Sequence, residues 1–456
     1  MPLDVVILAA GQGTRMRSSM PKVLHPMAGR PLLAHVIDVA ETLDPVAVHV
    51  VYGFGGDQVK TALADRDVSW HHQAEQLGTG HAVAQAMDAV ADDAQVLVLY
   101  GDVPLLRSST LTNLVKLGGP DGLGVLTVHL AEPKGYGRIV RDQDDHIVQI
   151  VEEKDATQEQ RQINEVNTGV IVCPAARLRE WISKLENTNA QGEYYLTDIV
   201  ELAVRDGVTV HALAAADEAE TLGVNDKVHL SEAETEYRSR IATALMRQGV
   251  TLADPRRIDV RGNLRCGSDV FIDVNAVFIG EVKLGDGVHI GPNVVVIDSQ
   301  IEDGTQVHPN CVIEKSHFGP RCQIGPFARV RPETYLGSTV KLGNFVEVKK
   351  SNIAKGSKVN HLSYVGDSTL GERVNVGAGT ITCNYDGANK HRTSIGDDVF
   401  IGSGVQLVAP VQVGDGATIG AGSVITKPAP ADKLTLERGK QMTLDGWKRP
   451  VKKPKS

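Results

Sequence analysis

Aromatic residues are scarce in this sequence of 456 residues: Phe, Trp and Tyr together make up 4% of it, although apolar residues as a whole make up 42%. Any large core must therefore be built mainly from valine, isoleucine, leucine and alanine. Such a composition is typical of stacked parallel strands. Because the chain is longer than one hydrophobic core usually supports, we expect two or three domains.

Basic residues are not in excess. The sequence has 47 Lys and Arg against 56 Asp and Glu, which gives a formal net charge of -9. A nucleic-acid partner is not expected, because no basic face large enough to neutralise a phosphate backbone is evident. The one local exception is the C-terminal tail, which we expect to be solvated and partly disordered; its basic residues are Lys448, Arg449, Lys452, Lys453 and Lys455.

Cysteines and long apolar runs are also few. The five cysteines are widely spaced and form no C-x-x-C pair, which disfavours a zinc site and a disulfide framework and favours reduced, mostly buried thiols. No uncharged apolar run reaches about 18 residues, and no signal-peptide pattern opens the chain. We therefore expect a soluble cytoplasmic protein with no membrane partner. The cysteines are Cys173, Cys266, Cys311, Cys322 and Cys383.

Short apolar runs alternate with helix-period segments through residues 1–227. This order predicts an α/β domain with a Rossmann-like, mostly parallel sheet covered on both faces. Ligands bind beyond the carboxyl ends of such strands, which indicates Ala9 to Arg15 and the Gly101-Asp102 pair. The expected strands are Val5 to Leu8, Val46 to Val51 and Val96 to Tyr100, and the expected helices are Leu32 to Leu43 and His81 to Val90.

Residues 228–248 have a different pattern, with Leu230, Ala233, Tyr237 and Ile241 on one face at spacings of three and four. This spacing predicts an amphipathic connecting helix. Gly249 and the following turn residues end it.

We expect residues 249–456 to form a further domain with a basic C-terminal tail, and beyond about residue 255 this domain has a six-residue period. Aliphatic or aromatic residues recur at Ile272, Phe278, Leu284, Ile290 and Val296, and the period continues to Ile425. Hexapeptide repetition predicts a parallel β-helix whose inward side chains stack from coil to coil. Phase slips between 348 and 353 and between 365 and 370, and an interruption between 376 and 395, predict loops that leave the prism.

A glycine-rich turn follows the first strand. Its segment Gly11-Gln12-Gly13-Thr14-Arg15 is joined by Lys22, so backbone N–H groups and two cations could hold a triphosphate. Asp102 follows a later strand, where a divalent metal could bridge it to phosphate oxygens. A plain strand-to-helix turn is the alternative for the glycines, and a turn-forming role is the alternative for Asp102.

At this point the sequence resembles the sugar-nucleotide pyrophosphorylase family. The segments that carry the resemblance are Leu8 to Met16, Lys22, Gln73 to Gly80, Gly101-Asp102, Gly135 to Arg138, Glu152 to Lys154, Asn167 to Gly169 and Gly192 to Asp198. With the hexapeptide half attached, the chain resembles, essentially end to end, the bifunctional bacterial N-acetylglucosamine-1-phosphate uridylyltransferase/glucosamine-1-phosphate N-acetyltransferases. The resemblance implies synthesis of UDP-N-acetylglucosamine for peptidoglycan and lipopolysaccharide precursors, and the choice of UTP rests on it alone.

The resemblance implies one set of residues for the nucleotide and another for the sugar. Asp102 and Asn225 would bind Mg²⁺. Asn225 has an alternative role as a helix cap, although Asp226 is the better candidate for that role. The implied nucleotide and phosphate contacts are Leu8, Ala9, Ala10, Gly11, Arg15, Lys22, Gln73, Gly78, Thr79, Tyr100 and Gly101, and the implied sugar contacts are Gly137, Glu152, Asn167, Tyr195 and Thr197.

A second group of reactive side chains interrupts the hexapeptide repeats. Acetyl transfer to an amino sugar needs a neutral amine and a base, and His361 is the natural candidate because imidazole titrates near neutral pH. A structural or solvated histidine is the alternative. The resemblance implies that glucosamine 1-phosphate contacts Arg331, Lys349, Tyr364 and Asn375, and that acetyl-CoA contacts Ala378, Asn384, Tyr385, Ser403, Ala421 and Arg438. It also implies a left-handed coil and a homotrimer with acetyl-transfer sites between neighbouring prisms.

Two other functions compete with this one. A nucleotidyltransferase with one activity would use its hexapeptide half only for assembly or regulation, and it would need neither a base nor an amine pocket. A non-enzymatic scaffold would be expected to lack Asp102 or the glycine loop. The sequence supplies His361, Lys349 and Tyr364 together, and it keeps both Asp102 and the loop, which favours the bifunctional enzyme.

Overall fold

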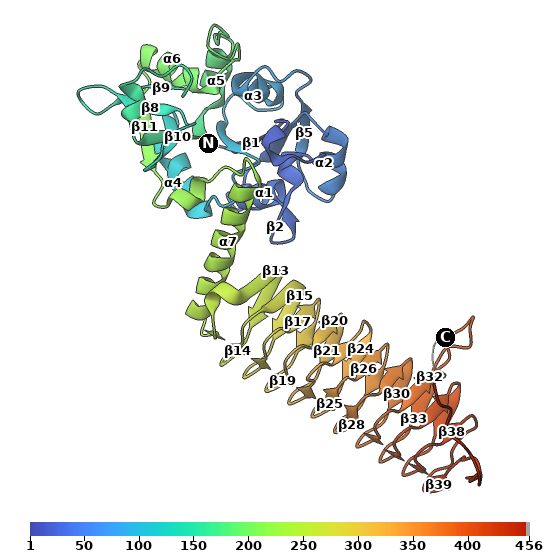
Figure 1. The fold of residues 1–456 in the computed structure, drawn as a ribbon. Helices are drawn as coiled ribbons and strands as arrows, with labels where there is room; N and C mark the ends of the chain where they lie inside the picture. The colour runs from blue at the N-terminus through green and yellow to red at the C-terminus, as the bar shows by residue number, and fades with distance from the viewer. Residues whose placement is uncertain (453–456) are drawn as a thin grey trace. The chain divides into compact units, whose positions relative to one another are not determined.

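The chain folds into two compact units, the first spanning Met1–Tyr237 and the second beginning at Arg238 (Figure 1). The structure is a computed structural model that describes residues 1–452, so Lys453 and Lys455 of the basic tail lie outside the described residues. The first unit is a sheet with helices, and the second is a stack of short strands. Both predicted architectures, α/β and parallel β-helix, are confirmed.

A mixed sheet forms the centre of the first unit. Its strand order is β11 (Val210–Ala214), β7 (Leu123–His129), β10 (Glu165–Pro174), β6 (Gln95–Tyr100), β1 (Leu3–Ala9), β4 (Ala47–Tyr52) and β5 (Ser69–His72). Strands β6, β1, β4 and β5 run parallel, but β10 is antiparallel to both β6 and β7. We expected a mostly parallel sheet and did not predict the antiparallel direction of β10. The chain reaches β10 through the hairpin of β8 (Arg138–Arg141) and β9 (Ile147–Val151) rather than through a helical crossover.

Both faces of this sheet are buried. Along β1, Val5 and Ile7 enter one core cluster, whereas Val6 and Leu8 enter the other, as the two-residue period of a strand requires. Helices α1 (Leu32–Glu41) and α4 (Ser108–Gly118) pack in the first cluster, and α3 (Thr79–Met87), α5 (Ala175–Ile182) and α6 (Ile199–Arg205) pack in the second. The short helix α2 (Gly56–Ala62) lies between β4 and β5 in the chain.

Helix α7 (Lys227–Arg247) connects the two units in the chain. Asp226 caps its first turn, because one carboxylate oxygen accepts hydrogen bonds from the N–H groups of residues 228 and 229 at 2.9 and 3.0 Å. The cap is therefore Asp226, as expected, and Asn225 is left for another role. Ala233 belongs to a core cluster of the first unit, and Leu245 belongs to the core of the second.

The second unit is a parallel β-helix built from two long ladders. The 11-stranded sheet contains β12 (Thr251–Leu252), β14 (Phe271–Ile272), β16 (His289–Ile290), β19 (Gln306–Val307), β22 (Gln323–Ile324), β25 (Lys341–Asn344), β28 (Lys358–His361), β31 (Asn375–Val376), β34 (Phe400–Ile401), β37 (Thr418–Ile419) and β39 (Leu434–Thr435). Its neighbouring strands pair in parallel, for example Leu342 with Val359 one coil later. Its left-handed coiling stays an implication of the family resemblance.

The 17-stranded sheet covers the other sides of the prism. It contains β13 (Ile258–Cys266), β15 (Ala276–Leu284), β17 (Val295–Ile297), β18 (Gln300–Ile301), β20 (Val312–Glu314), β21 (Ser316–Phe318), β23 (Arg329–Val330), β24 (Thr334–Leu336), β26 (Glu347–Lys349), β27 (Asn352–Ile353), β29 (Tyr364–Gly366), β30 (Ser368–Leu370), β32 (Ile381–Cys383), β33 (Thr393–Ile395), β35 (Gln406–Val408), β36 (Val411–Val413) and β38 (Val424–Ile425).

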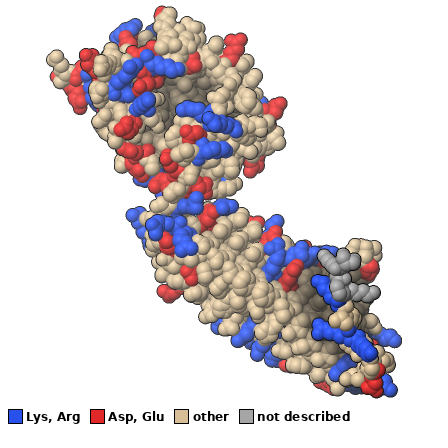
Figure 2. Space-filling model, viewed as in Figure 1, with Lys and Arg blue, Asp and Glu red and all other residues tan. Residues whose placement is uncertain are grey.

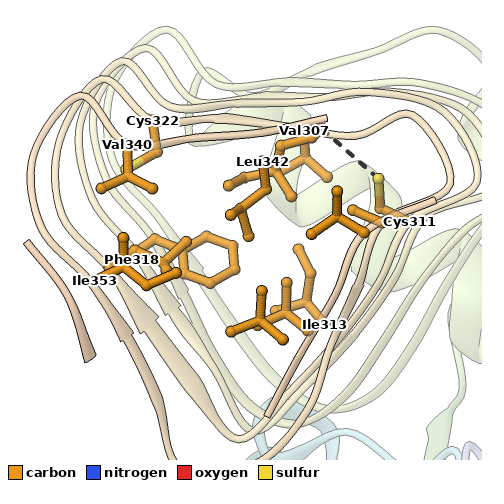
Figure 3. Close-up of a cluster of buried hydrophobic side chains, with 14 of the residues drawn as sticks. Val307, Cys311, Ile313, Phe318, Cys322, Val340, Leu342 and Ile353 are labelled. Atoms are coloured by element: carbon orange, nitrogen blue, oxygen red, sulfur yellow. Dashed lines mark hydrogen bonds between the residues drawn. The ribbon is translucent and has the colours of Figure 1, made fainter. Parts of the chain in front are cut away.

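Stacked side chains fill the prism, as the six-residue period predicts. Figure 3 shows part of this core, in which Val307 and Leu342 come from one side and Ile313 from another. Phe318 fills the space between the sides and is fully buried. One inward residue per six-residue side is therefore the rule that builds the unit.

The two predicted phase slips do not leave the prism, so that part of the prediction was wrong. At each slip a single residue in the left-handed region, Lys350 (φ 47°) or Asp367 (φ 49°), makes a corner one residue shorter than the usual one. The flanking strands β26, β27, β29 and β30 remain in the ladder. Within the predicted interruption, β32 also stays in the ladder, and residues 384–392 form the excursion.

The five cysteines are free thiols. Cys173, Cys311 and Cys322 are buried, and burial raises the pKa of Cys311 and Cys322 to about 11. Free thiols, three of them buried, agree with the expectation of reduced, mostly buried cysteines.

Charge is mixed on the face of the first unit that Figure 2 shows, where Lys and Arg lie interspersed with Asp and Glu. The visible face of the second unit carries a broad expanse of uncharged side chains between groups of basic ones. None of the described helices is both long enough and apolar enough to span a bilayer.

Candidate functional sites

A cavity of about 260 Å³ opens where β1 and β6 end. The two strands are adjacent and parallel, and the N–H of Gly101 donates to the carbonyl of Leu8 at 2.9 Å, so the glycine turn and Asp102 meet at one edge. The cavity is lined by Leu8, Ala9, Ala10, Gly11, Lys22, Val23, Gln73, Gln76, Gly78, Thr79, Ala82, Tyr100, Asp102 and Glu193. Ten of the predicted residues therefore lie together, although larger hollows of about 860 and 500 Å³ elsewhere contain none of them.

Gly78 shapes one wall of this cavity. Its φ of +112° is a conformation that residues with a Cβ rarely adopt, and an added Cβ would lie 2.6 Å from the carbonyl oxygen of Tyr194. The Gln73 side-chain amide donates to the Gly78 carbonyl at 3.1 Å and so fixes the turn before α3. Only glycine permits this close approach to the Tyr194 backbone, which sets the position of this wall of the cavity.

Two cations and two oxygen donors meet beside the cavity. Lys22 Nζ contacts a carboxylate oxygen of Asp102 and lies 3.5 Å from Asn225 Oδ1, and Arg15 donates to the same amide oxygen at 2.8 Å. Asn225 is thus placed beside Asp102, although 123 positions separate them in the chain. A carboxylate oxygen and an amide oxygen are the kind of donors that Mg²⁺ takes, together with water and phosphate oxygens. The two residues therefore fit the implied metal.

The residues implied for the sugar lie on either side of the β8–β9 hairpin in the chain, since Gly137 precedes β8 and the others follow β9. Thr197 Oγ1 donates to Glu152 Oε1 at 3.1 Å, and the N–H of Asn167 donates to the carbonyl of Gly137 at 2.8 Å. Burial raises the pKa of Glu152 above its ordinary value, partly offset by the Thr197 hydrogen bond. The structure brings four of these residues into two bonded pairs, and Tyr195 lies two positions before Thr197 in the chain.

Asp198 is a further acidic residue close to Glu152. Asp198 is half-buried, and its burial, followed by the charges of Glu152, Glu201 and Asp155, raises its pKa to about 6. No pattern in the sequence indicated this shift, because the four carboxylates come from two segments more than 40 positions apart.

His361 lies exposed at the end of β28, beside Asn344 on the preceding coil. Its Nδ1 is 3.2 Å from Asn344 Oδ1. The tautomer is assigned from this contact: an amide oxygen can only accept, so Nδ1 carries the proton and the lone pair is on Nε2. The imidazole is thus oriented with its basic nitrogen free for a substrate, as a general base requires.

Three of the four residues implied for glucosamine 1-phosphate lie in strands of the 17-stranded sheet or directly after one: Arg331, Lys349 and Tyr364. Arg331 donates to Glu347 at 2.9 Å, and Glu347 pairs with Tyr364 on the next coil. The side-chain contact with Lys390 lowers the pKa of Lys349. Two amines so close together would be stabilised by a dianion. Lys390 lies in the 384–392 excursion and was not predicted as a site residue. The excursion folds back onto the prism and so places Lys390 beside Lys349, which the sequence alone does not indicate.

The excursion is tied back to the prism. The Asn384 side-chain amide contacts Asp367 and lies 3.4 Å from the Tyr364 hydroxyl, both on the prism. Within the excursion, His391 contacts Asp386 at 2.7 Å. Tyr385 is exposed, with 60% of its surface accessible. Predicted sugar-phosphate and acetyl-CoA residues therefore lie next to each other at Tyr364 and Asn384.

Small residues stack along one corner of the last coils. The N–H of Gly404 donates to the carbonyl of Ala378 at 2.7 Å, and the N–H of Gly422 donates to Ser403 at 2.8 Å, so positions 378, 403 and 421 lie on successive coils. An added Cβ at Gly420 would lie 3.0 Å from Arg438 Nη2, which places that guanidinium beside Ala421. Ala378, Ser403 and Ala421, three of the predicted acetyl-CoA residues, thus form a strip along successive coils, with Arg438 beside its last member.

Asn375 is placed apart from the other sugar-phosphate residues. It lies in β31 of the 11-stranded sheet, whereas Arg331, Lys349 and Tyr364 lie along the 17-stranded sheet. Among the described residues, the Asn375 side chain makes no hydrogen bond to any of these three.

Comparison with known proteins agrees with the division of the chain into an α/β unit and a β-helix unit. Residues 5–193 match the MobA-like NTP transferase domain family, and residues 263–298 and 392–427 match the bacterial transferase hexapeptide (six repeats) family. The bifunctional protein GlmU of Ralstonia pickettii strain 12J is 57% identical over 453 residues, which cover 99% of this chain and 100% of the relative. Those of Cupriavidus pinatubonensis strain JMP 134 and Azoarcus sp. strain BH72 are 59% and 58% identical, with the same coverage. The chain therefore belongs to the family of the bifunctional protein GlmU.

Proposed function

We propose that the chain is a bifunctional enzyme of UDP-N-acetylglucosamine synthesis. The second unit transfers the acetyl group of acetyl-CoA to glucosamine 1-phosphate, and the first unit transfers UMP from UTP to the resulting N-acetylglucosamine 1-phosphate. Two observations support this proposal: phosphate-binding and metal-binding side chains cluster beside the cavity of the first unit, and the second unit carries an oriented His361 and a row of cations at Arg331, Lys349 and Lys390. The product would supply cytoplasmic precursors of peptidoglycan and lipopolysaccharide.

Uridylyl transfer needs positioning more than proton transfer. The sugar phosphate has a second pKa of about 6 and is already largely a dianion near neutral pH, so its oxygen attacks the α-phosphorus without a general base. A new P–O bond forms as the bond to pyrophosphate breaks. Arg15 and Lys22 neutralise the phosphates, and backbone N–H groups near Gly11 orient them.

Mg²⁺ would be held by Asp102 and Asn225. When bound, it supplies charge neutralisation on the phosphate oxygens. Lys22 contacts both Asp102 and Asn225, and Arg15 contacts Asn225, so the two cations share a location with the proposed metal ligands. This shared location supports one combined site for metal and triphosphate.

Acetyl transfer needs a base. The amine of glucosamine 1-phosphate attacks the thioester carbon, a C–N bond forms, and the C–S bond breaks. His361 Nε2 takes the amine proton, and coenzyme A leaves as the thiol after gaining a proton. Arg331, Lys349 and Lys390 would bind the sugar phosphate, and their mutual proximity supports binding of a dianion. Backbone N–H groups near Ala378 could stabilise the tetrahedral oxyanion.

Assembly as a homotrimer would complete this second site. Asn375 lies on a different sheet from the other sugar-phosphate residues, so a neighbouring copy would have to bring its own Asn375 to them. The flat sides of a β-helix suit such lateral packing.

The two activities can be separated by substitution. Purified protein is incubated with glucosamine 1-phosphate, acetyl-CoA, UTP and Mg²⁺. We expect His361→Ala to make no sugar nucleotide from glucosamine 1-phosphate but to convert N-acetylglucosamine 1-phosphate, and Asp102→Ala to accumulate N-acetylglucosamine 1-phosphate. His317→Ala and Asp93→Ala serve as matched controls, because His317 lies on another side of the same prism and Asp93 is exposed in the first unit.

The outcome also decides between the competing functions. A wild-type protein that uses UTP but never acetylates glucosamine 1-phosphate would be an enzyme with one activity. Loss of both reactions in either variant would contradict separate sites.

A further inference from the structure

The segment 189–197 of the first unit is hydrogen-bonded on two sides. Toward the nucleotide cavity, the N–H of Tyr194 donates to the Leu77 carbonyl at 2.8 Å, and the N–H of Leu196 donates to Thr79 Oγ1 at 3.0 Å. Toward the sugar residues, Thr197 bonds Glu152. The segment therefore lies between the residues implied for the two substrates.

A ring of side chains fastens this segment to the turn that follows β9. The Asp155 carboxylate accepts from the N–H of Ala190 at 3.0 Å and from the Tyr195 hydroxyl at 3.4 Å. Gln191 donates to the same hydroxyl at 2.9 Å, and Lys154 donates to Gln191 Oε1 at 2.5 Å. Three of these bonds join residues 154–155 to residues 190–195, and the bond between Gln191 and Tyr195 closes the ring.

The Tyr195 hydroxyl is held from both directions. Burial raises the pKa of Tyr195, so the phenol keeps its proton and donates it to Asp155 while accepting from Gln191. The Tyr195 side chain itself is 7% exposed, whereas Asp155 is exposed at the surface. Removal of the carboxylate would therefore free the segment without opening a cavity in the core.

We propose that Asp155 is a positioning residue for the first unit's sugar pocket: its carboxylate fixes the Ala190–Tyr195 segment so that Tyr195 and Thr197 meet the sugar phosphate. Resting on the proposed function, this inference adds a residue outside the predicted set. Asp155 bonds Ala190 and Tyr195, which do not line the cavity around Gly11, whereas the part of the segment that does is held separately by the Tyr194 and Leu196 N–H groups, so we expect its effect to fall on the sugar phosphate more than on UTP.

The test measures steady-state uridylyl transfer by Asp155→Ala and Asp155→Asn with each substrate varied in turn. Each lost hydrogen bond is modest, so we expect the KM for N-acetylglucosamine 1-phosphate to rise about three- to tenfold in the alanine variant. The asparagine variant should fall between it and the wild type, because an amide oxygen can still accept one of the two bonds. The KM for UTP should change less than about twofold, and Asp93→Asn should match the wild type.

A double-mutant cycle tests whether Asp155 acts through the tyrosine hydroxyl. In a Tyr195→Phe background the Asp155→Ala change should raise the KM for the sugar phosphate by a smaller factor than in the wild type, because one of its two partners is already gone. Acetyl transfer by the same samples reports that the second unit is intact.

An unchanged KM for the sugar phosphate in Asp155→Ala, an equal rise in the KM for UTP, or the same effect in the Tyr195→Phe background would overturn the positioning role. A wild-type protein that does not consume UTP would instead overturn the proposed function, and this inference with it. The two failures are therefore distinguishable in one set of assays.

Discussion

The substitution Phe318→Ala tests the physical basis of the β-helix. Phe318 is fully buried, and it pairs with Ile301 on the preceding coil and with Leu336 on the following coil. Truncation of a buried Phe to Ala costs about 3–5 kcal/mol, because the packed side chains cannot collapse into the space. Since each coil contacts only its neighbours, this loss should lower the stability of the second unit.

Two probes follow the two units during urea unfolding. Trp70 and the fully buried Trp181 lie in the first unit, whereas Trp447 is 68% exposed and should change little, so tryptophan fluorescence follows the first unit. Residual acetyl transfer follows the second. We expect Phe318→Ala to shift the acetyl-transfer midpoint to lower urea and to leave the fluorescence midpoint unchanged, at one fixed protein concentration.

Tyr335→Ala is the matched control. Tyr335 lies on the next coil, but 58% of it is exposed, so its loss should cost less than about 1 kcal/mol. Equal effects of Phe318→Ala and Tyr335→Ala would refute the assignment of inward and outward positions.

Two further substitutions test the first unit. The pKa of Asp198, about 6 when folded against 3.8 ordinarily, means that the folded protein retains a proton that the unfolded chain releases, so stability falls as pH rises from about 4 to 6. Asp198→Asn should remove this fall, so the variant should be more stable than the wild type at pH 7.5 by on the order of 1 kcal/mol after allowance for solvent screening, with no gain near pH 4. Thermal unfolding at several pH values measures this difference in stability. An equal gain at every pH would contradict the titration of Asp198. Gly78→Ala would place a Cβ 2.6 Å from the Tyr194 carbonyl at a φ of +112°, so the KM for UTP should rise at least about tenfold. Gly119→Ala, at a φ of +59° but with no atom within 4 Å of the added Cβ, should leave that KM near the wild-type value, and equal values for both variants would argue against the close approach at Gly78.

The β-helix could be predicted from the sequence because one rule, an inward apolar residue on each six-residue side, repeats along the unit. The rule failed at the corners that contain Lys350 and Asp367, where one left-handed residue shortens the turn without ending the ladder. A five-residue spacing therefore does not distinguish a tight corner from a loop.

The direction of β10 could not be predicted from the sequence. Apolar alternation reports that a strand is buried, but it carries no information on whether its neighbour is parallel. The hairpin β8–β9 reverses the chain before β10, and only the three-dimensional pairing of Ile171 with Val98 shows the result.

Site residues could be predicted from the sequence where polar or glycine residues come directly after a buried strand. The glycine turn after β1 and Asp102 after β6 share one sheet edge for this reason. Asn225 came only from the resemblance, and Lys390 and Asp155 were missed, because their partners lie in segments distant in the sequence. The roles of the site residues and the domain limits at 227 and 248 stay predictions.

The most direct test of two independent sites is a crystal structure with UDP-N-acetylglucosamine and coenzyme A bound together. Our account predicts that the nucleotide sugar lies in the cavity beside Gly11 and Asp102, and that coenzyme A follows the strip of Ala378, Ser403 and Ala421 with its thiol near His361. Binding of either molecule away from these residues would contradict the account.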